Sequence, residues 1–154
     1  MPCCADSASL PLRAQRSDGL CSIRAFEYFP DKEKSVREFA RLIKPGGLLL
    51  LVTKNRGYKG YGIKKIDNES SAPSPETIHS GNVLACELVD LLKRNGFEDI
   101  RIKPAIIGRT RLIFLWKTIR YLRRLVDISW RDSIPAPFSG LVESFMITAY
   151  KTSA

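Results

Sequence analysis

Glu27 is the side chain that the sequence best places for acid–base chemistry. It directly follows Asp18–Phe26, which contains a short apolar run typical of a strand. Ligands of parallel α/β sheets collect at the carboxyl ends of the strands, so a carboxylate in this position faces the place where a reacting group would lie. Glu27 is therefore the candidate general base. The alternative is an exposed loop acid without a chemical role.

Neither a metal centre nor a disulfide framework is indicated. The four cysteines fit no metal-ligand spacing, and the only histidine lies in a polar stretch (Cys3, Cys4, Cys21, Cys86 and His79). The sequence predicts reduced thiols. Residues 1–22 lack the pattern of a signal peptide, and no apolar run approaches the length of about 18 residues that a membrane span needs. We therefore expect a cytoplasmic protein.

The elements that would position Glu27 have the order of a parallel α/β sheet. Beyond the first apolar run, apolar residues recur at helical spacing (Val36, Phe39, Ala40, Leu42 and Ile43). Pro45, Gly46 and Gly47 are expected to end this helix. Leu48–Val52, five aliphatic residues in a row, predicts a buried strand that is covered by helices on both faces.

The C-terminal half adds a helix and two strands. Leucines from Leu84 to Leu92 fall at helical spacing, and Gly96 is a typical stop. Phe97–Lys103 alternates apolar and charged residues and predicts a strand ended by Pro104. Glu143–Lys151 predicts the last strand. With 154 residues and 44% hydrophobic content, we expect one domain, residues 1–154.

The basic charge of the chain is concentrated before this last strand. Residues 101–131 hold nine basic side chains against Asp127 alone, while the whole chain has a net charge of +9. Residues 109–131 predict an amphipathic helix, whose apolar face is Leu112, Leu115, Trp116, Ile119, Leu122, Val126 and Trp130. Three roles stay open: a cap packed on the sheet over an acceptor site, contact with an anionic membrane surface, or neutralisation of the phosphates of RNA or another polyanion.

Residues 55–82 are rich in Gly, Ser, Pro and charge and predict a long loop. A connection of this length in a compact domain is usually functional or disordered. The loop begins with Arg56–Gly62, which holds Tyr58, Lys59 and Tyr61. A solvated loop that the glycines keep flexible is the alternative to a functional role.

Three ordered segments resemble the class I S-adenosylmethionine-dependent methyltransferases of the methyltransferase type 11 kind. Arg41–Leu50 (RLIKPGGLLL) matches the end of the helix and the turn before the family's fifth strand. Ser17–Leu20 stands for the Phe-Asp-hydrophobic opening of the fourth strand, with Ser17 in place of Phe. Ala5–Leu12 resembles the Asp-Ala-x-x-Leu-Pro-Phe segment after the third strand.

The resemblance implies S-adenosylmethionine as the cofactor and gives roles to several residues. Asp6 would accept the adenine amino group, since a carboxylate is a pure acceptor, and the backbone of Ser7 would contact the ring. Backbone of the loop after the fourth strand would hold the methionine end of the cofactor. These roles fall on Asp6, Ser7, Ile23, Arg24 and Ala25 for the cofactor, and on Tyr28, Tyr58 and Tyr61 for the methyl acceptor, with Lys59 beside an anionic group.

The family's sheet order, 3-2-1-4-5-7-6, implies a partial Rossmann-like sheet with strands equivalent to 4-5-7-6, the last strand antiparallel, flanking helices and an insertion over 105–140. The glycine-rich cofactor loop would lie before Met1, so an N-terminally truncated domain is expected. The fourth strand would then be a bare edge prone to self-association.

Two functions follow as expectations. The first is methyl transfer to a small-molecule or lipid-like acceptor, by an incomplete fragment with weak or no activity alone. The alternative is a non-catalytic binding or scaffold protein that uses residues 109–131 to engage a membrane surface, a polyanion such as RNA, or a partner chain.

Overall fold

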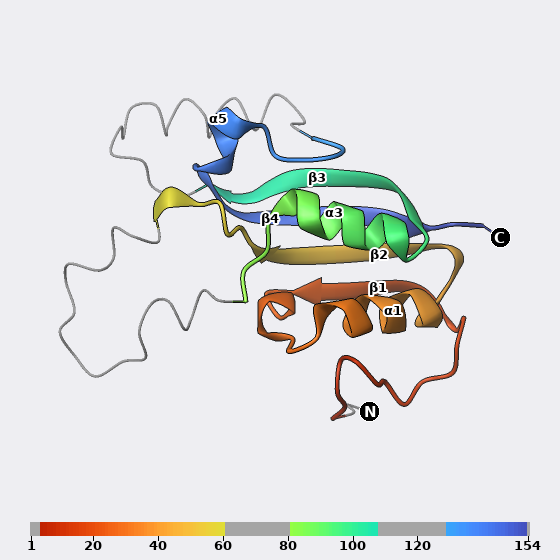
Figure 1. Ribbon diagram of the computed structural model, residues 1–154. Helices are drawn as coiled ribbons and strands as arrows, with labels where there is room; N and C mark the ends of the chain where they lie inside the picture. Colours follow the sequence, from red (N-terminus) through yellow and green to blue (C-terminus); the bar gives the residue numbers. More distant parts are fainter. Residues whose placement is uncertain (1–3, 61–80, 108–128, 154) are drawn as a thin grey trace, which may run out of the picture.

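The computed structural model describes residues 4–60, 81–107 and 129–153, which form one mixed sheet with helices packed on it (Figure 1). The elements are, in chain order, β1 (Ser17–Ile23), the 3-10 turn η1 (Phe26–Tyr28), α1 (Lys32–Leu42), β2 (Ile43–Lys54), α3 (Ala85–Arg94), β3 (Phe97–Ile107), α5 (Ala136–Ser139) and β4 (Val142–Lys151).

The four strands lie in the order β1-β2-β4-β3. β1 runs parallel to β2, with Cys21 opposite Leu50. β4 is inserted antiparallel to both of its neighbours, with Leu50 opposite Thr148 on β2 and Ile102 opposite Ile147 on β3. The sequence-based order 4-5-7-6, with an antiparallel last strand, is therefore confirmed.

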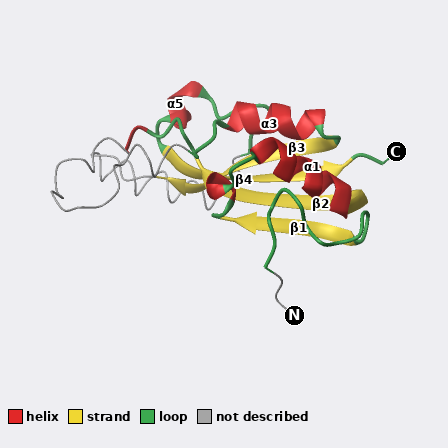
Figure 2. Cartoon of the chain, turned by 60° about the horizontal axis from the view of Figure 1, so that its bottom comes forward, coloured by secondary structure: helices red, strands yellow, loops and turns green. Residues whose placement is uncertain are grey.

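α1 and α3 pack on the same face of the sheet, as Figure 1 and Figure 2 both show. On β2, Leu49, Leu51 and Thr53 are buried, whereas the alternating Leu50 and Val52 are only half-buried. The expectation that helices cover both faces of Leu48–Val52 is thus wrong for the described residues. A run of leucines does not reveal how completely each face is covered, because alternation is lost when both faces are apolar.

α1 begins and ends at identifiable signals. Asp31 caps its start, because the carboxylate accepts the N–H of Lys34 at 2.9 Å. The helix ends at Leu42, before Pro45, and Ile43 already belongs to β2. Gly46 then takes the left-handed conformation, with φ at 75°, that glycine adopts without strain.

Pro104 does not end β3, contrary to the sequence-based expectation. The strand continues to Ile107, and Pro104 lies opposite Phe145 of β4. β3 is an edge strand, where a residue without an N–H can be accommodated. The predicted stop at Gly96 is confirmed, because α3 ends at Arg94 and Gly96 has φ at 74°.

Most of the predicted helix 109–131, and of the predicted insertion 105–140 around it, lies outside the described residues. Its C-terminal end is not helical, because Trp130 pairs with Ile102 of β3 through N···O distances of 2.6 and 2.8 Å. Trp130 also lies 5.9 Å from Phe138 between ring centroids. Trp130, the last residue of the predicted apolar face, therefore forms a β-bridge to the edge strand β3.

Candidate functional site

Glu27 lies in η1, directly beyond the carboxyl end of β1, and its carboxylate is buried. The residue is 4% exposed. Oε2 accepts a hydrogen bond from Thr53 Oγ1 at 3.1 Å, and Oε1 lies 3.3 Å from Arg24 Nε. The alternative of an exposed loop acid is therefore wrong. A buried carboxylate requires such partners, because desolvation of an unpaired charge is costly.

Arg24 connects the ends of three strands. Its backbone has φ at 56°, in the left-handed region, and its N–H donates to the carbonyl of Val52 on β2 at 2.8 Å. Its side chain pairs with Glu27 and also donates from Nη1 to Ser144 Oγ of β4 at 3.0 Å. The side chain is still 37% exposed. Part of the Arg24 side chain is therefore exposed to solvent at the carboxyl end of the sheet.

Ile23 and Ala25 flank Arg24 and differ in exposure and in hydrogen bonding. Ile23 is 62% exposed at the end of β1. The carbonyl of Ala25 is occupied, because it accepts the N–H of Tyr28 at 2.9 Å. The structure thus brings three sequence-predicted residues together here, Arg24, Glu27 and Tyr28, around one tight turn.

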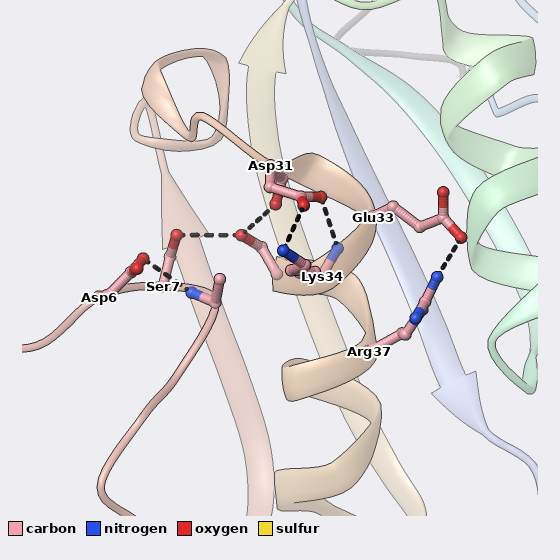
Figure 3. Close-up of polar contacts among 8 residues, drawn as sticks. Asp6, Ser7, Asp31, Glu33, Lys34 and Arg37 are labelled. Atoms are coloured by element: carbon pink, nitrogen blue, oxygen red, sulfur yellow. Dashed lines mark hydrogen bonds and ion pairs between the residues drawn. The ribbon is translucent and has the colours of Figure 1, made fainter.

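Asp6 and Ser7 lie beside the start of α1, as Figure 3 shows. Asp6 Oδ1 accepts the N–H of Ala8 at 3.0 Å, and the Asp6 side chain is exposed. Ser7 Oγ lies 3.0 Å from Ser35 Oγ, which in turn donates to the carbonyl of Asp31 at 2.8 Å. These contacts hold the N-terminal segment against α1. In the parts of the chain that are described, no hydrogen bond joins Asp6 or Ser7 to residues 23–25.

The three predicted acceptor tyrosines have different surroundings. Tyr28 is 65% exposed. Tyr58 is half-buried just after the end of β2, and burial, together with the charge of Glu143, raises the pKa of its hydroxyl. Tyr61 lies outside the described residues.

Asn55 joins the end of β2 to the residues before and at the start of β4, a role that sequence reasoning missed. It is 1% exposed, and its Nδ2 donates to the carbonyls of Ser139 and Val142, both at 2.9 Å. Its Oδ1 accepts the N–H of Gly57 at 3.0 Å. The sequence signals this role only through a polar residue at the end of a strand. The partners of Asn55 are distant in sequence and could not be predicted.

Gly81, where the chain returns to this end of the sheet, packs directly on η1. A Cβ atom at Gly81 would lie 1.7 Å from the carbonyl oxygen of Glu27. Only glycine allows so close an approach. Gly81 and the η1 turn that carries Glu27 are therefore in direct contact.

Within the described residues, no group of three or more His, Cys, Asp and Glu side chains could hold a metal ion. No helix among those residues has the length and apolar character that crossing a membrane requires.

Comparisons with known proteins point to one family. Residues 2–51 match the family model described as a methyltransferase domain. The ubiquinone biosynthesis O-methyltransferase of Coxiella burnetii is 40% identical over 58 residues, which are 38% of this chain and 25% of that protein. The chain thus spans a quarter of the length of the curated relatives that it matches.

Solved structures share the fold over nearly the whole chain. A S-adenosylmethionine-dependent methyltransferase of Thermotoga maritima has a TM-score of 0.62 and 18% identity, over 95% of this chain and 61% of its own. Phosphoethanolamine N-methyltransferase 2 of Haemonchus contortus, solved with S-adenosyl-L-methionine, has a TM-score of 0.58 and 14% identity, over 96% of this chain and 36% of its own.

Proposed function

Because the chain is related to the class I S-adenosylmethionine-dependent methyltransferases and has the corresponding sheet, we propose that it serves methyl transfer to a small-molecule or lipid-like acceptor. The observation that carries the proposal is the overlap of two independent results. The family match covers residues 2–51, and β1, η1, α1 and most of β2 lie in that range with the order and direction of the family's sheet.

S-adenosylmethionine is the proposed cofactor, and Asp6 and Ser7 are its proposed adenine contacts. Asp6 is exposed, and among the described residues only its Oδ1 accepts a hydrogen bond, so Oδ2 is available there to an exocyclic amine. The hydroxyl of Ser7 is committed to Ser35, which leaves its backbone N–H as the group that would meet the ring. Ile23, Arg24 and Ala25 would flank the methionine end.

A hydroxyl oxygen is the proposed acceptor atom, because the relative from Coxiella burnetii is named an O-methyltransferase. When bound, the cofactor supplies a methyl group already activated on a sulfonium, so the protein mainly positions the acceptor and excludes water. The hydroxyl proton must leave as the O–C bond forms. Glu27 is the proposed base for this proton. Its Oε1 accepts no hydrogen bond among the described residues but is buried beside Arg24 Nε, so the acceptor would reach it only after the Arg24 side chain moves aside.

Tyr28 and Tyr58 are the proposed walls of the acceptor site, with Tyr61 and Lys59 following in the chain. Both described tyrosines lie just beyond the carboxyl ends of β1 and β2, where ligands collect in such sheets. The relatives are longer than this chain, so weak or no activity of the chain alone is part of the proposal.

Calorimetric titration with S-adenosylmethionine tests the cofactor proposal. We expect micromolar binding by the natural sequence and at least a tenfold weaker affinity for Asp6→Ala, because a charge-assisted hydrogen bond contributes roughly 1.5–3 kcal/mol. Asp90→Ala removes a carboxylate from α3 and is the matched control. Equal binding by both variants would contradict the adenine role of Asp6.

The second candidate function is a non-catalytic protein that binds a membrane surface, a polyanion or a partner chain through residues 109–131. The observation that favours it is the local excess of nine basic residues over one acidic residue in 101–131. Absence of cofactor binding, together with salt-sensitive association with anionic vesicles or RNA, would replace the first proposal by this one.

A further inference from the structure

A groove lies at the end of the sheet opposite to the proposed cofactor site. It has a volume of ≈ 430 Å³ and is lined by Pro11, Leu12, Arg13, Arg16, Ser17 and Leu42. We call it the amino-end groove, because Ser17 begins β1 and Leu42 ends α1. In Figure 1 this region is at the right of the view, where the chain enters β1, while η1 and the end of β2 lie at the left.

The walls of the amino-end groove are fixed by hydrogen bonds to backbone carbonyls. The guanidinium of Arg41 donates to the carbonyls of Leu10 and Leu12, at 3.1 and 2.9 Å. The next turn is tied to α1, because the N–H groups of Gln15 and Arg16 donate to the last helical carbonyls, those of Arg41 and Leu42, at 2.9 and 3.0 Å. A preformed site of this kind loses little entropy when it binds a ligand.

The groove combines an apolar floor with two unpaired cations. Leu42 is buried beneath it, whereas Leu12 is 59% exposed and offers an apolar wall to solvent. Arg13 and Arg16 are exposed, and neither has a carboxylate partner in the part of the chain that the structure describes. The other charged groups next to them are neutralised, Arg41 by Glu38 and Asp18 by Lys44.

The carbonyls at the end of α1 would otherwise repel an anion, since they carry the negative end of the helix dipole. Here the N–H groups of Gln15 and Arg16 satisfy two of them, and the side chains of Arg13 and Arg16 line the same groove. Guanidinium groups bind carboxylates, sulfonates and phosphates through paired N–H donors.

We propose that the amino-end groove binds a small amphiphilic anion, in which one acidic group lies between Arg13 and Arg16 and an apolar body packs on Leu12 and Leu42. Its volume is in the range of about 300–1,000 Å³ that ligand sites occupy. This site is separate from methyl transfer and does not depend on the proposed function.

Titration with naphthalene-2-sulfonate tests the proposal, followed by backbone amide NMR shifts. We expect shifts centred on residues 12–17 and 42, and at least a tenfold weaker affinity for the double variant Arg13→Gln, Arg16→Gln. The double variant Arg37→Gln, Arg94→Gln is the control, because it removes the same charge from the exposed surfaces of α1 and α3. The uncharged naphthalene-2-sulfonamide should bind at least tenfold more weakly than the sulfonate.

Three results would overturn the proposal. The first is equal affinity of the two double variants for the sulfonate, provided that their amide spectra show an intact fold. The second is equal binding of the sulfonate and the sulfonamide. The third is association with anionic lipid vesicles that requires Arg13 and Arg16 while the free sulfonate does not bind, which would assign these cations to a membrane surface.

Discussion

Asn55 shows how one residue can determine the shape of the carboxyl end of the sheet. Its amide group joins the end of β2 to Ser139 and Val142, the residues at which α5 ends and β4 begins. If the amide were removed, the buried carbonyl of Val142 and the part-buried carbonyl of Ser139 would both lose this donor. A loss of this kind is more costly than the net value of the hydrogen bonds themselves.

We therefore predict that Asn55→Ala lowers the free energy of unfolding by about 2–4 kcal/mol, from the lost hydrogen bonds and the unsatisfied carbonyls. Urea denaturation followed by circular dichroism measures the change. Asn95→Ala is the control, because Asn95 is half-buried and its amide makes one hydrogen bond, to the carbonyl of Leu91 at 2.8 Å. Equal losses in the two variants would show that the contacts of Asn55 with Ser139 and Val142 do not stabilise the fold more than an ordinary helix-end hydrogen bond.

For single residues, the sequence predicts the place in the fold better than the residues that contact the side chain. Glu27 lies beyond β1 as expected, but its burial depends on Thr53 and Arg24, and a carboxylate in a loop gives no local signal of a partner. The importance of Asn55 could not be predicted either. Its partners are 84 and 87 residues away, and asparagine after a strand is also typical of an ordinary turn.

At the scale of elements, α1 is the scaffold to which the N-terminal segment is tied. Glu38 accepts the N–H of Leu10 at 3.3 Å and pairs with Arg41, whose guanidinium holds two further carbonyls of the segment. The hydrogen bond from Arg41 is the main reason why the pKa of the Glu38 carboxyl is lowered, and the N–H of Leu10 adds to this effect.

A carboxyl with a lowered pKa in the folded state stabilises the fold at pH values above its unfolded pKa, and this contribution is lost as the pH falls through the folded pKa. We predict that stability decreases from about pH 5 downward, since the unfolded pKa of Glu is about 4.3. Glu38→Gln should make this decrease shallower. Asp18, Asp31 and Asp132 also have lowered pKa values and should keep part of the slope in the variant. Thermal unfolding at a series of pH values measures it, and an unchanged slope in Glu38→Gln would contradict the prediction.

The elements themselves are well predicted where the chain carries two agreeing signals. The apolar spacing and the Pro45-Gly46-Gly47 stop predict α1, and Leu88, Leu92 and Gly96 predict α3. The prediction fails at Pro104, because local rules treat proline as a strand terminator, while the tolerance of an edge strand depends on which strand ends up at the edge. Which strand lies at the edge is determined by the whole sheet and cannot be predicted from one segment.

For the whole molecule, the resemblance to the family predicts the sheet order, and the structure adds how the faces are covered. Residues such as Leu50 and Val52 are half-buried, although their sequence resembles that of a fully covered strand. Among the described helices, α1 and α3 both lie on one face, and the helical period of a segment does not predict which face of the sheet it will cover.

The edge of the sheet at β1 yields the last prediction. β1 pairs with β2 on one side, and no other described strand pairs with it. The usual protection of an edge is limited to its start, where Asp18 carries a charge and the register shifts between Ser17 and Gly19. The rest of the strand, Leu20–Ile23, carries no charge, and Ile23 is 62% exposed. We predict that the chain is marginally stable and self-associates, and that Ile23→Lys shifts it toward the monomer in light scattering over a concentration series.

Ile106→Lys, on the opposite edge strand where Ile106 is 43% exposed, is the matched control and should leave the association unchanged. A chain that is monomeric at every concentration, with a single unfolding transition at high denaturant, would show that the edge at β1 is not adhesive.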